Sequence, residues 1–273
     1  MTKDDLRAGL AALGVEAGSL VMVHASLRRI GLGRAEFGPG GAEALLEALD
    51  DAVGPDGTLL MVIGTDYAMD RANLHPPEAR AALLAGSPPF DHRNAPALPE
   101  VGWLAEAFRR RAGTIVSGNP SGRFGARGAR AAELMADQPW HDYYGPGSPL
   151  DKLCAQGGKV LRLGANPDTV TALHYAEYLA DLPDKRRTRW DYVLAGPDGT
   201  PEHRWIECLD DSNGIADWDG EDYFALILEA YLALGRHREG LVGKARSELL
   251  DAADHVAFGT RWMEKNLAAP AQP

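Results

Sequence analysis

The chain has 273 residues, and 28 basic against 39 acidic side chains leave a formal charge of −11 at pH 7. With 45% hydrophobic and 25% charged residues, the composition is that of an ordinary soluble globular protein and excludes a disordered one. The acidic balance argues against general nucleic-acid binding, the apolar runs are too short to span a membrane, and two cysteines are too few for a disulfide framework.

Stretches with helical spacing of apolar residues alternate with short apolar runs that contain β-branched residues. The first helix is expected at 2–13, where Thr2 is an N-cap candidate, Asp5 follows three residues later and Gly14 ends the pattern. Further helices are expected, in chain order, at 40–53, 77–84, 102–111, 129–136, 149–156, 169–180, 221–234 and 251–267. Strands are expected at 20–23, 58–63, 114–116, 159–163, 187–194 and 202–209.

This alternation predicts an α/β protein in which a mixed central sheet is flanked by helices, with an antiparallel hairpin near 190–209. We expect a single domain over 1–273, because no repeat or low-complexity segment divides the chain. The segment 66–99 is irregular and rich in Pro, His and Asp, and a connection of this length is usually functional or an insertion.

The unit at 159–180 carries the strongest chemical signal. On its predicted helix, Thr171, His174, Glu177 and Tyr178 lie at spacings of three, three and one, which places them on one stripe. A carboxylate beside an imidazole selects its tautomer and raises its pKa, as a general base at neutral pH requires. The alternative is a solvated polar face of a helix.

Metal binding and polycation binding are two further possibilities for the polar residues of this chain. His174 and Glu177 lack the second histidine of the common zinc motifs, so no metal is expected. The segment 207–222 has seven acidic residues and no Lys or Arg, which indicates either a solvated loop or a negative lining for a polycation. The acidic residues are Glu207, Asp210, Asp211, Asp217, Asp219, Glu221 and Asp222.

His24 directly follows the first predicted strand, where α/β proteins often place ligand contacts. A satisfied core histidine is the alternative. The chain lacks a Walker A pattern, a Rossmann glycine fingerprint and a Gly-x-Ser-x-Gly elbow. These absences argue against NAD, ATP and serine-hydrolase chemistry.

Short segments along most of the chain match one family in order. They include Val-Met-Val-His-Ala-Ser-Leu at 21–27 and Thr-Ala-Leu-His-Tyr-Ala-Glu at 171–177, with further matches at 53–58, 89–91, 147–150, 185–187, 211–214, 235–240 and 254–259. Together they resemble the aminoglycoside 3-N-acetyltransferase family. The resemblance implies transfer of the acetyl group of acetyl-CoA to the 3-amino group of a 2-deoxystreptamine antibiotic, by direct attack in a ternary complex that gives antibiotic resistance.

The resemblance also implies roles for particular residues. His174 becomes the general base, Glu177 its partner and Thr171 a donor near the thioester oxygen. The candidates for the CoA side are His24, Ser26, Leu27, Ser117 and Ser148. The candidates for the antibiotic side are Asp66, Asp211, Asn213 and Tyr178, of which Asp211 is expected to hold an ammonium group.

Two departures from the family pattern affect the expected substrate range. Many members have His where this chain has Asn119, and a Ser-Trp pair where it has Gly64 and Thr65. The alternatives are therefore a CoA-dependent acetyltransferase of the same fold that acts on another amine, and a non-catalytic protein that sequesters aminoglycosides. We expect small-molecule partners, no nucleic acid or membrane, a cytoplasmic location and a monomer or homodimer.

Overall fold

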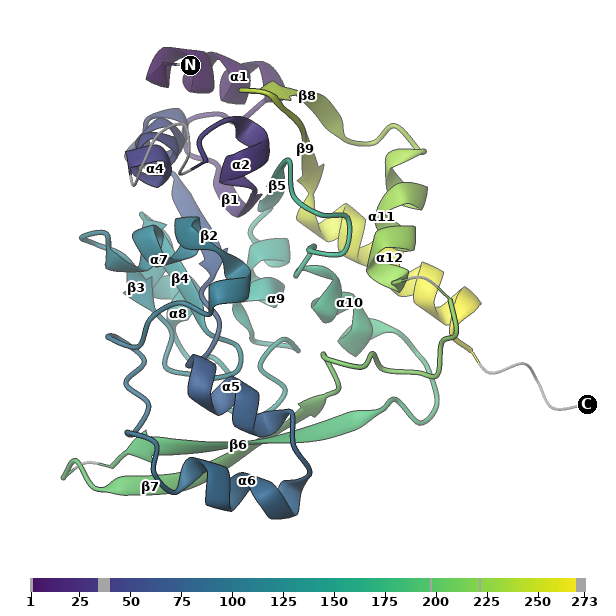
Figure 1. Ribbon diagram of the computed structural model, residues 1–273. Helices are drawn as coiled ribbons and strands as arrows, with labels where there is room; N and C mark the ends of the chain where they lie inside the picture. The colour runs from purple at the N-terminus through teal and green to yellow at the C-terminus, as the bar shows by residue number, and fades with distance from the viewer. Residues whose placement is uncertain (1, 34–39, 197, 221, 269–273) are drawn as a thin grey trace, which may run out of the picture.

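The computed structural model describes residues 2–33, 40–196, 198–220 and 222–268. Its largest sheet has seven strands in the order β3-β4-β2-β1-β5-β9-β8 within these residues, and β6 and β7 form a separate two-stranded sheet (Figure 1). The strands are β1 Leu20–Ala25, β2 Thr58–Val62, β3 Ile115–Val116, β4 Phe124–Gly128, β5 Lys159–Leu163, β6 Arg187–Ala195, β7 Pro201–Leu209, β8 Arg238–Val242 and β9 Ala245–Asp251. The predicted mixed α/β fold with an antiparallel hairpin is confirmed.

The central strands determine where the site lies. β1 is parallel to both β2 and β5, whereas β4 and β9 run antiparallel to the strands beside them. The carboxyl ends of β1 and β5 therefore meet at one edge of the sheet, and the loops that follow them lie side by side.

Helices cover both faces of the sheet. One face holds an apolar core with α1 Lys3–Leu13, α2 Leu27–Ile30, α4 Gly40–Val53 and α7 Trp103–Arg110. The other holds α8 Ala131–Met135, α9 Pro149–Ala155, α10 Leu173–Leu179, α11 Tyr223–Leu232 and α12 Ala252–Asn266. None of the described helices has the length and apolar composition needed to cross a bilayer.

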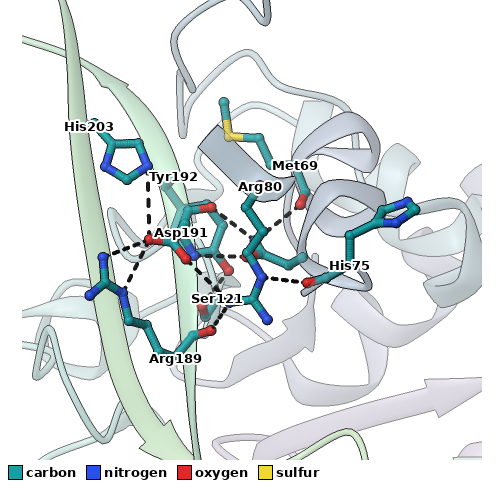
Figure 2. Close-up of polar contacts among 9 residues, drawn as sticks. Met69, His75, Arg80, Ser121, Arg189, Asp191, Tyr192 and His203 are labelled. Atoms are coloured by element: carbon teal, nitrogen blue, oxygen red, sulfur yellow. Dashed lines mark hydrogen bonds and ion pairs between the residues drawn. The ribbon is translucent and has the colours of Figure 1, made fainter. Parts of the chain in front are cut away.

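The segment 66–99 forms α5 Tyr67–Asn73 and α6 Pro77–Leu84, which pack against β6 (Figure 1). The Asn73 side chain exchanges two hydrogen bonds with the backbone of Asp191, at 2.8 and 2.9 Å. Figure 2 shows the Asp191 carboxylate of β6 between Arg80 of α6 and Arg189. The insertion is therefore held on the hairpin by buried polar contacts.

Most predicted elements are present, with boundary shifts of a few residues, and α6 matches its predicted range. Within the described residues, five helices and strands were not predicted, namely α2, α5, β4, β8 and β9, and neither was the short 3-10 helix Pro99–Val101. The predicted helix at 169–180 begins only at Leu173, because two turns precede it. The first is closed by Thr169, whose hydroxyl donates to the Asn166 carbonyl at 2.7 Å, and the second lies at 171–172. Thr171 therefore precedes the helix, and it does not share a helical face with His174, Glu177 and Tyr178 as predicted.

Candidate active site

His174 and Glu177 form a hydrogen-bonded pair on α10. His174 Nδ1 lies 2.7 Å from Glu177 Oε2, and Glu177 is only 1% exposed. Residues three apart lie on the same side of a helix, so the local fold alone brings the two side chains together. The carboxylate selects the tautomer that carries hydrogen on Nδ1, which leaves Nε2 as the basic nitrogen.

A tyrosine holds the other oxygen of the carboxylate. The Tyr223 hydroxyl, at the start of α11, donates to Glu177 Oε1 and accepts from the Ile215 amide at 3.4 Å. Burial, with the neighbouring Glu177 charge, raises the pKa of Tyr223 well above its usual value, so the hydroxyl keeps its proton. Sequence reasoning missed Tyr223, whose only local signal is its position after the helix-capping Asp222.

Aromatic rings determine the orientation of the imidazole. The Tyr144 ring stacks on His174 with centroids 4.8 Å apart and an interplanar angle of 10°, and Phe224 meets it edge-on, also at 4.8 Å. Burial lowers the pKa of His174, but Glu177, Asp211 and Asp222 outweigh it and raise that pKa above 6.5. Within the described residues, Nε2 has no hydrogen-bond partner. With Nδ1 bound to Glu177, Nε2 is the ring nitrogen that remains for a further partner.

Asp211 lies beside this pair among tyrosine rings. Its Oδ2 accepts from the Tyr143 hydroxyl at 2.5 Å. Burial raises the pKa of Asp211, and the nearby His174 opposes that shift. A partly desolvated carboxylate next to aromatic faces is a favourable place for an ammonium group.

A cavity of about 610 Å³ opens at the carboxyl ends of β1 and β5. Four of the predicted site residues line it, namely His24, Ser26, Leu27 and Thr171. β1 extends through Ala25, so His24 is a strand residue rather than the first residue of a loop. Burial, assisted by the Arg162 charge, lowers the pKa of His24 to about 3, and its buried Nε2 has no partner within the described chain. His24 therefore presents a neutral imidazole to the cavity.

The structure does not bring the other two predicted CoA contacts to this cavity. Ser117 is buried and closes a turn, donating to the Gly122 carbonyl at 3.2 Å and accepting from the Phe124 amide at 3.0 Å. Ser148 is buried as the N-cap of α9, where it accepts from the Asp151 amide at 3.3 Å. Both hydroxyls therefore form hydrogen bonds with backbone groups.

Three predicted antibiotic contacts likewise have hydrogen-bond partners within the protein. Asp66 caps α5, and the Asn213 amide donates to Asp210 at 3.0 Å. The Tyr178 hydroxyl accepts from the Leu209 amide at 3.1 Å, which ties α10 to the hairpin. Of the four predicted antibiotic contacts, only Asp211 has its carboxylate beside His174.

The acidic segment and Asn119 have mainly structural contacts. Asp217 pairs with Arg186, Glu207 with Arg187 at 3.3 Å, and Asp222 caps α11, while Glu221 lies outside the described residues. The Asn119 amide donates to the carbonyls of residues 139 and 140 and accepts from the amides of 121 and 122. Asn119 therefore holds a turn together. No cluster of three or more metal-ligating side chains occurs in the described part of the chain.

The chain matches known proteins over nearly its whole length. A family model described as aminoglycoside 3-N-acetyltransferase matches residues 22–264. Aminoglycoside N(3)-acetyltransferase III of Serratia marcescens is 39% identical over 98% of this chain and 99% of its own length. The structure of AAC-IIIb with CoASH is 42% identical, covers 100% of this chain and 99% of its own, and superposes with a TM-score of 0.86. AAC-VIa bound to sisomicin is 39% identical, covers 98% and 99%, and has a TM-score of 0.87.

Proposed function

The chain belongs to the aminoglycoside 3-N-acetyltransferase family, and we propose that it transfers the acetyl group of acetyl-CoA to the 3-amino group of a 2-deoxystreptamine aminoglycoside. The observation that carries the proposal is the hydrogen-bonded His174–Glu177 pair with its buried carboxylate, together with the nearby charge of Asp211, which acts on the imidazole. A polycationic substrate needs both features, because one ammonium group must be held while a neighbouring amine loses its proton.

The proposed reaction is direct transfer in a ternary complex. His174 Nε2 takes a proton from the 3-amino group as the amine nitrogen attacks the thioester carbon. The C–N bond forms and the C–S bond breaks. The sulfur takes the proton from His174 and leaves as the CoA thiol. Glu177, held by Tyr223, stabilises the imidazolium that forms in between.

The Thr171 hydroxyl is proposed to donate to the oxyanion of the tetrahedral intermediate, since Thr171 lines the cavity three residues before His174. A covalent acetyl-enzyme is not needed. Burial raises the pKa of the Cys154 thiol to about 12, and that of Cys208 further, so neither is a ready nucleophile.

Acetyl-CoA is proposed to occupy the cavity lined by His24, Ser26 and Leu27, and the structural neighbour crystallised with CoASH supports this side of the proposal. The antibiotic is proposed to approach from the side of Asp211 and the aromatic rings. Acetylation removes one positive charge from the antibiotic, and we propose that this loss of charge causes resistance. A cytoplasmic location and a monomeric or homodimeric state stay predictions.

Thiol release from acetyl-CoA by the purified protein tests the function, with gentamicin, kanamycin, neomycin and apramycin as acceptors. We expect release that depends on at least one antibiotic and on its free 3-amino group, as judged by the mass and position of the product. Release only with other amines would contradict the substrate assignment. Antibiotic binding without CoA binding would favour a sequestering protein instead.

A further inference from the structure

A row of polar side chains crosses the middle of the sheet. His24 of β1 is the register neighbour of Arg162 on β5, and Arg162 is the neighbour of Glu248 on β9. Register neighbours point to the same face, so the three side chains lie in line. Arg162 is only 3% exposed, which makes its charge expensive to keep in the core.

The guanidinium of Arg162 has two different kinds of partner. Its Nη1 donates to Glu248 Oε2 at 3.0 Å, which compensates the charge. Its Nη2 donates to the carbonyls of Ala165 and Asn166, at 3.0 and 2.9 Å. These two carbonyls belong to the loop between β5 and α10. One side chain therefore joins the sheet to that loop.

The same loop forms one wall of the cavity. Ala165, Asn166 and Thr169 line it, together with Thr171. From the opposite side, Arg29 Nη1 donates to the Gly164 carbonyl at 2.8 Å and Nη2 to Asn166 Oδ1 at 2.6 Å. The loop is thus held by guanidinium groups from within the sheet and from α2.

We propose that Arg162 is a positioning residue that preforms the acyl-donor wall of the cavity through the carbonyls of Ala165 and Asn166. The inference rests on the proposed function. A buried ion pair is often no more stabilising than an apolar pair of the same size, so stability alone does not explain this charge. Directed bonds to two loop carbonyls do explain it, because a preformed wall avoids the ordering cost of binding.

The test compares Arg162→Lys with Glu248→Gln in the full chain. Lysine keeps a positive charge opposite Glu248 but lacks the planar fork that reaches both carbonyls. Glutamine breaks the ion pair and leaves the two loop bonds in place. We expect Arg162→Lys to weaken CoA binding in calorimetry, and to raise KM for acetyl-CoA, by roughly 10- to 100-fold. The kcat, its pH profile and the antibiotic KM should change little, and Glu248→Gln should lower Tm but not CoA affinity.

Gly164→Ala provides a second variant that leaves Arg162 in place. Its Cβ would lie 2.9 Å from the Ala245 Cβ and 3.1 Å from the Arg29 Cβ, at a φ of +62°, so it displaces the same loop. It should weaken CoA binding as Arg162→Lys does. Unchanged CoA affinity in Arg162→Lys, or equal weakening in Glu248→Gln, would overturn the inference. A wild-type protein that binds no CoA would overturn the proposed function as well.

Discussion

Two buried carboxylates of this protein differ in the side chains that contact them. Asp191, on the hairpin strand β6, is 4% exposed and faces Arg80 at 3.2 Å and Arg189 at 2.9 Å (Figure 2). Glu177, on α10, is 1% exposed and faces His174 at 2.7 Å and the Tyr223 hydroxyl. Burial and hydrogen bonding are similar at the two positions, and only the chemistry of the partners differs.

We propose that this difference separates a structural cluster from a catalytic one. A guanidinium does not release its proton at neutral pH, so Arg80 and Arg189 serve to hold the insertion on the hairpin. The imidazole of His203, at 3.8 Å, lies beyond hydrogen-bond distance of the Asp191 carboxylate. The imidazole of His174, whose pKa Glu177 raises, can gain and lose a proton, so we propose that the Glu177 cluster exchanges a proton with a substrate. Burial of a carboxylate therefore identifies neither role by itself.

The largest expected effect is on turnover at the Glu177 cluster. His174→Ala should lower kcat roughly 10²- to 10⁴-fold, because the general base is lost, with little change in Tm. Steady-state thiol release and thermal melting measure the two. His203→Ala is the matched control, since His203 lies at the exposed edge of the Asp191 cluster, 3.8 Å from its carboxylate. Near-normal turnover in His174→Ala would refute the assigned base.

The Asp191 cluster should respond in stability instead. Asp191→Ala leaves the buried Arg80 without its carboxylate and should cost about 3–5 kcal/mol in the free energy of unfolding. Arg189→Ala, which removes a half-exposed partner, should cost about 1 kcal/mol or less. Urea unfolding measures both. A stable Asp191→Ala protein with a large loss of kcat would show that the two clusters are not functionally distinct.

The pH profile tests the charge at the Glu177 cluster. Protonated His174 cannot act as a base, so activity should rise with pH through a pKa above 6.5. Glu177 stabilises the protonated form, and Glu177→Gln should therefore move this acidic limb to lower pH. It should also lower the plateau by roughly 10- to 100-fold, through loss of a charged hydrogen bond. A limb that stays in place would mean that another group titrates.

The smallest effect is expected at the antibiotic side. Asp211→Asn should raise the antibiotic KM by roughly tenfold at low ionic strength, and less in high salt, while leaving KM for acetyl-CoA unchanged. Asp217→Asn is the control, because the Asp217 side chain is fully exposed and pairs with Arg186. If the two variants behave alike, Asp211 does not contact the antibiotic.

The sequence determined what depends on neighbours along the chain. The capped helix at α1, the hairpin strands β6 and β7 and the pairing of His174 with Glu177 all follow from spacings of two to four residues. The alternation of strands and helices was enough to predict the mixed α/β fold. The family motifs then predicted that the general base, His174, lies on the helix after β5.

Only the tertiary structure decided which distant groups complete these local features. Tyr223 lies 46 residues from Glu177, and Arg162 lies 86 from Glu248, and no local pattern marks such pairs. The strands β8 and β9 were missed because their charged sequences become strands only through pairing, β9 with β5 and β8 with β9. Ser117 and Ser148 are both expected CoA contacts from the family resemblance, yet their hydroxyls bond to backbone amides. The reason is physical: long-range contacts depend on how the elements pack together, and spacing along the chain does not encode that packing.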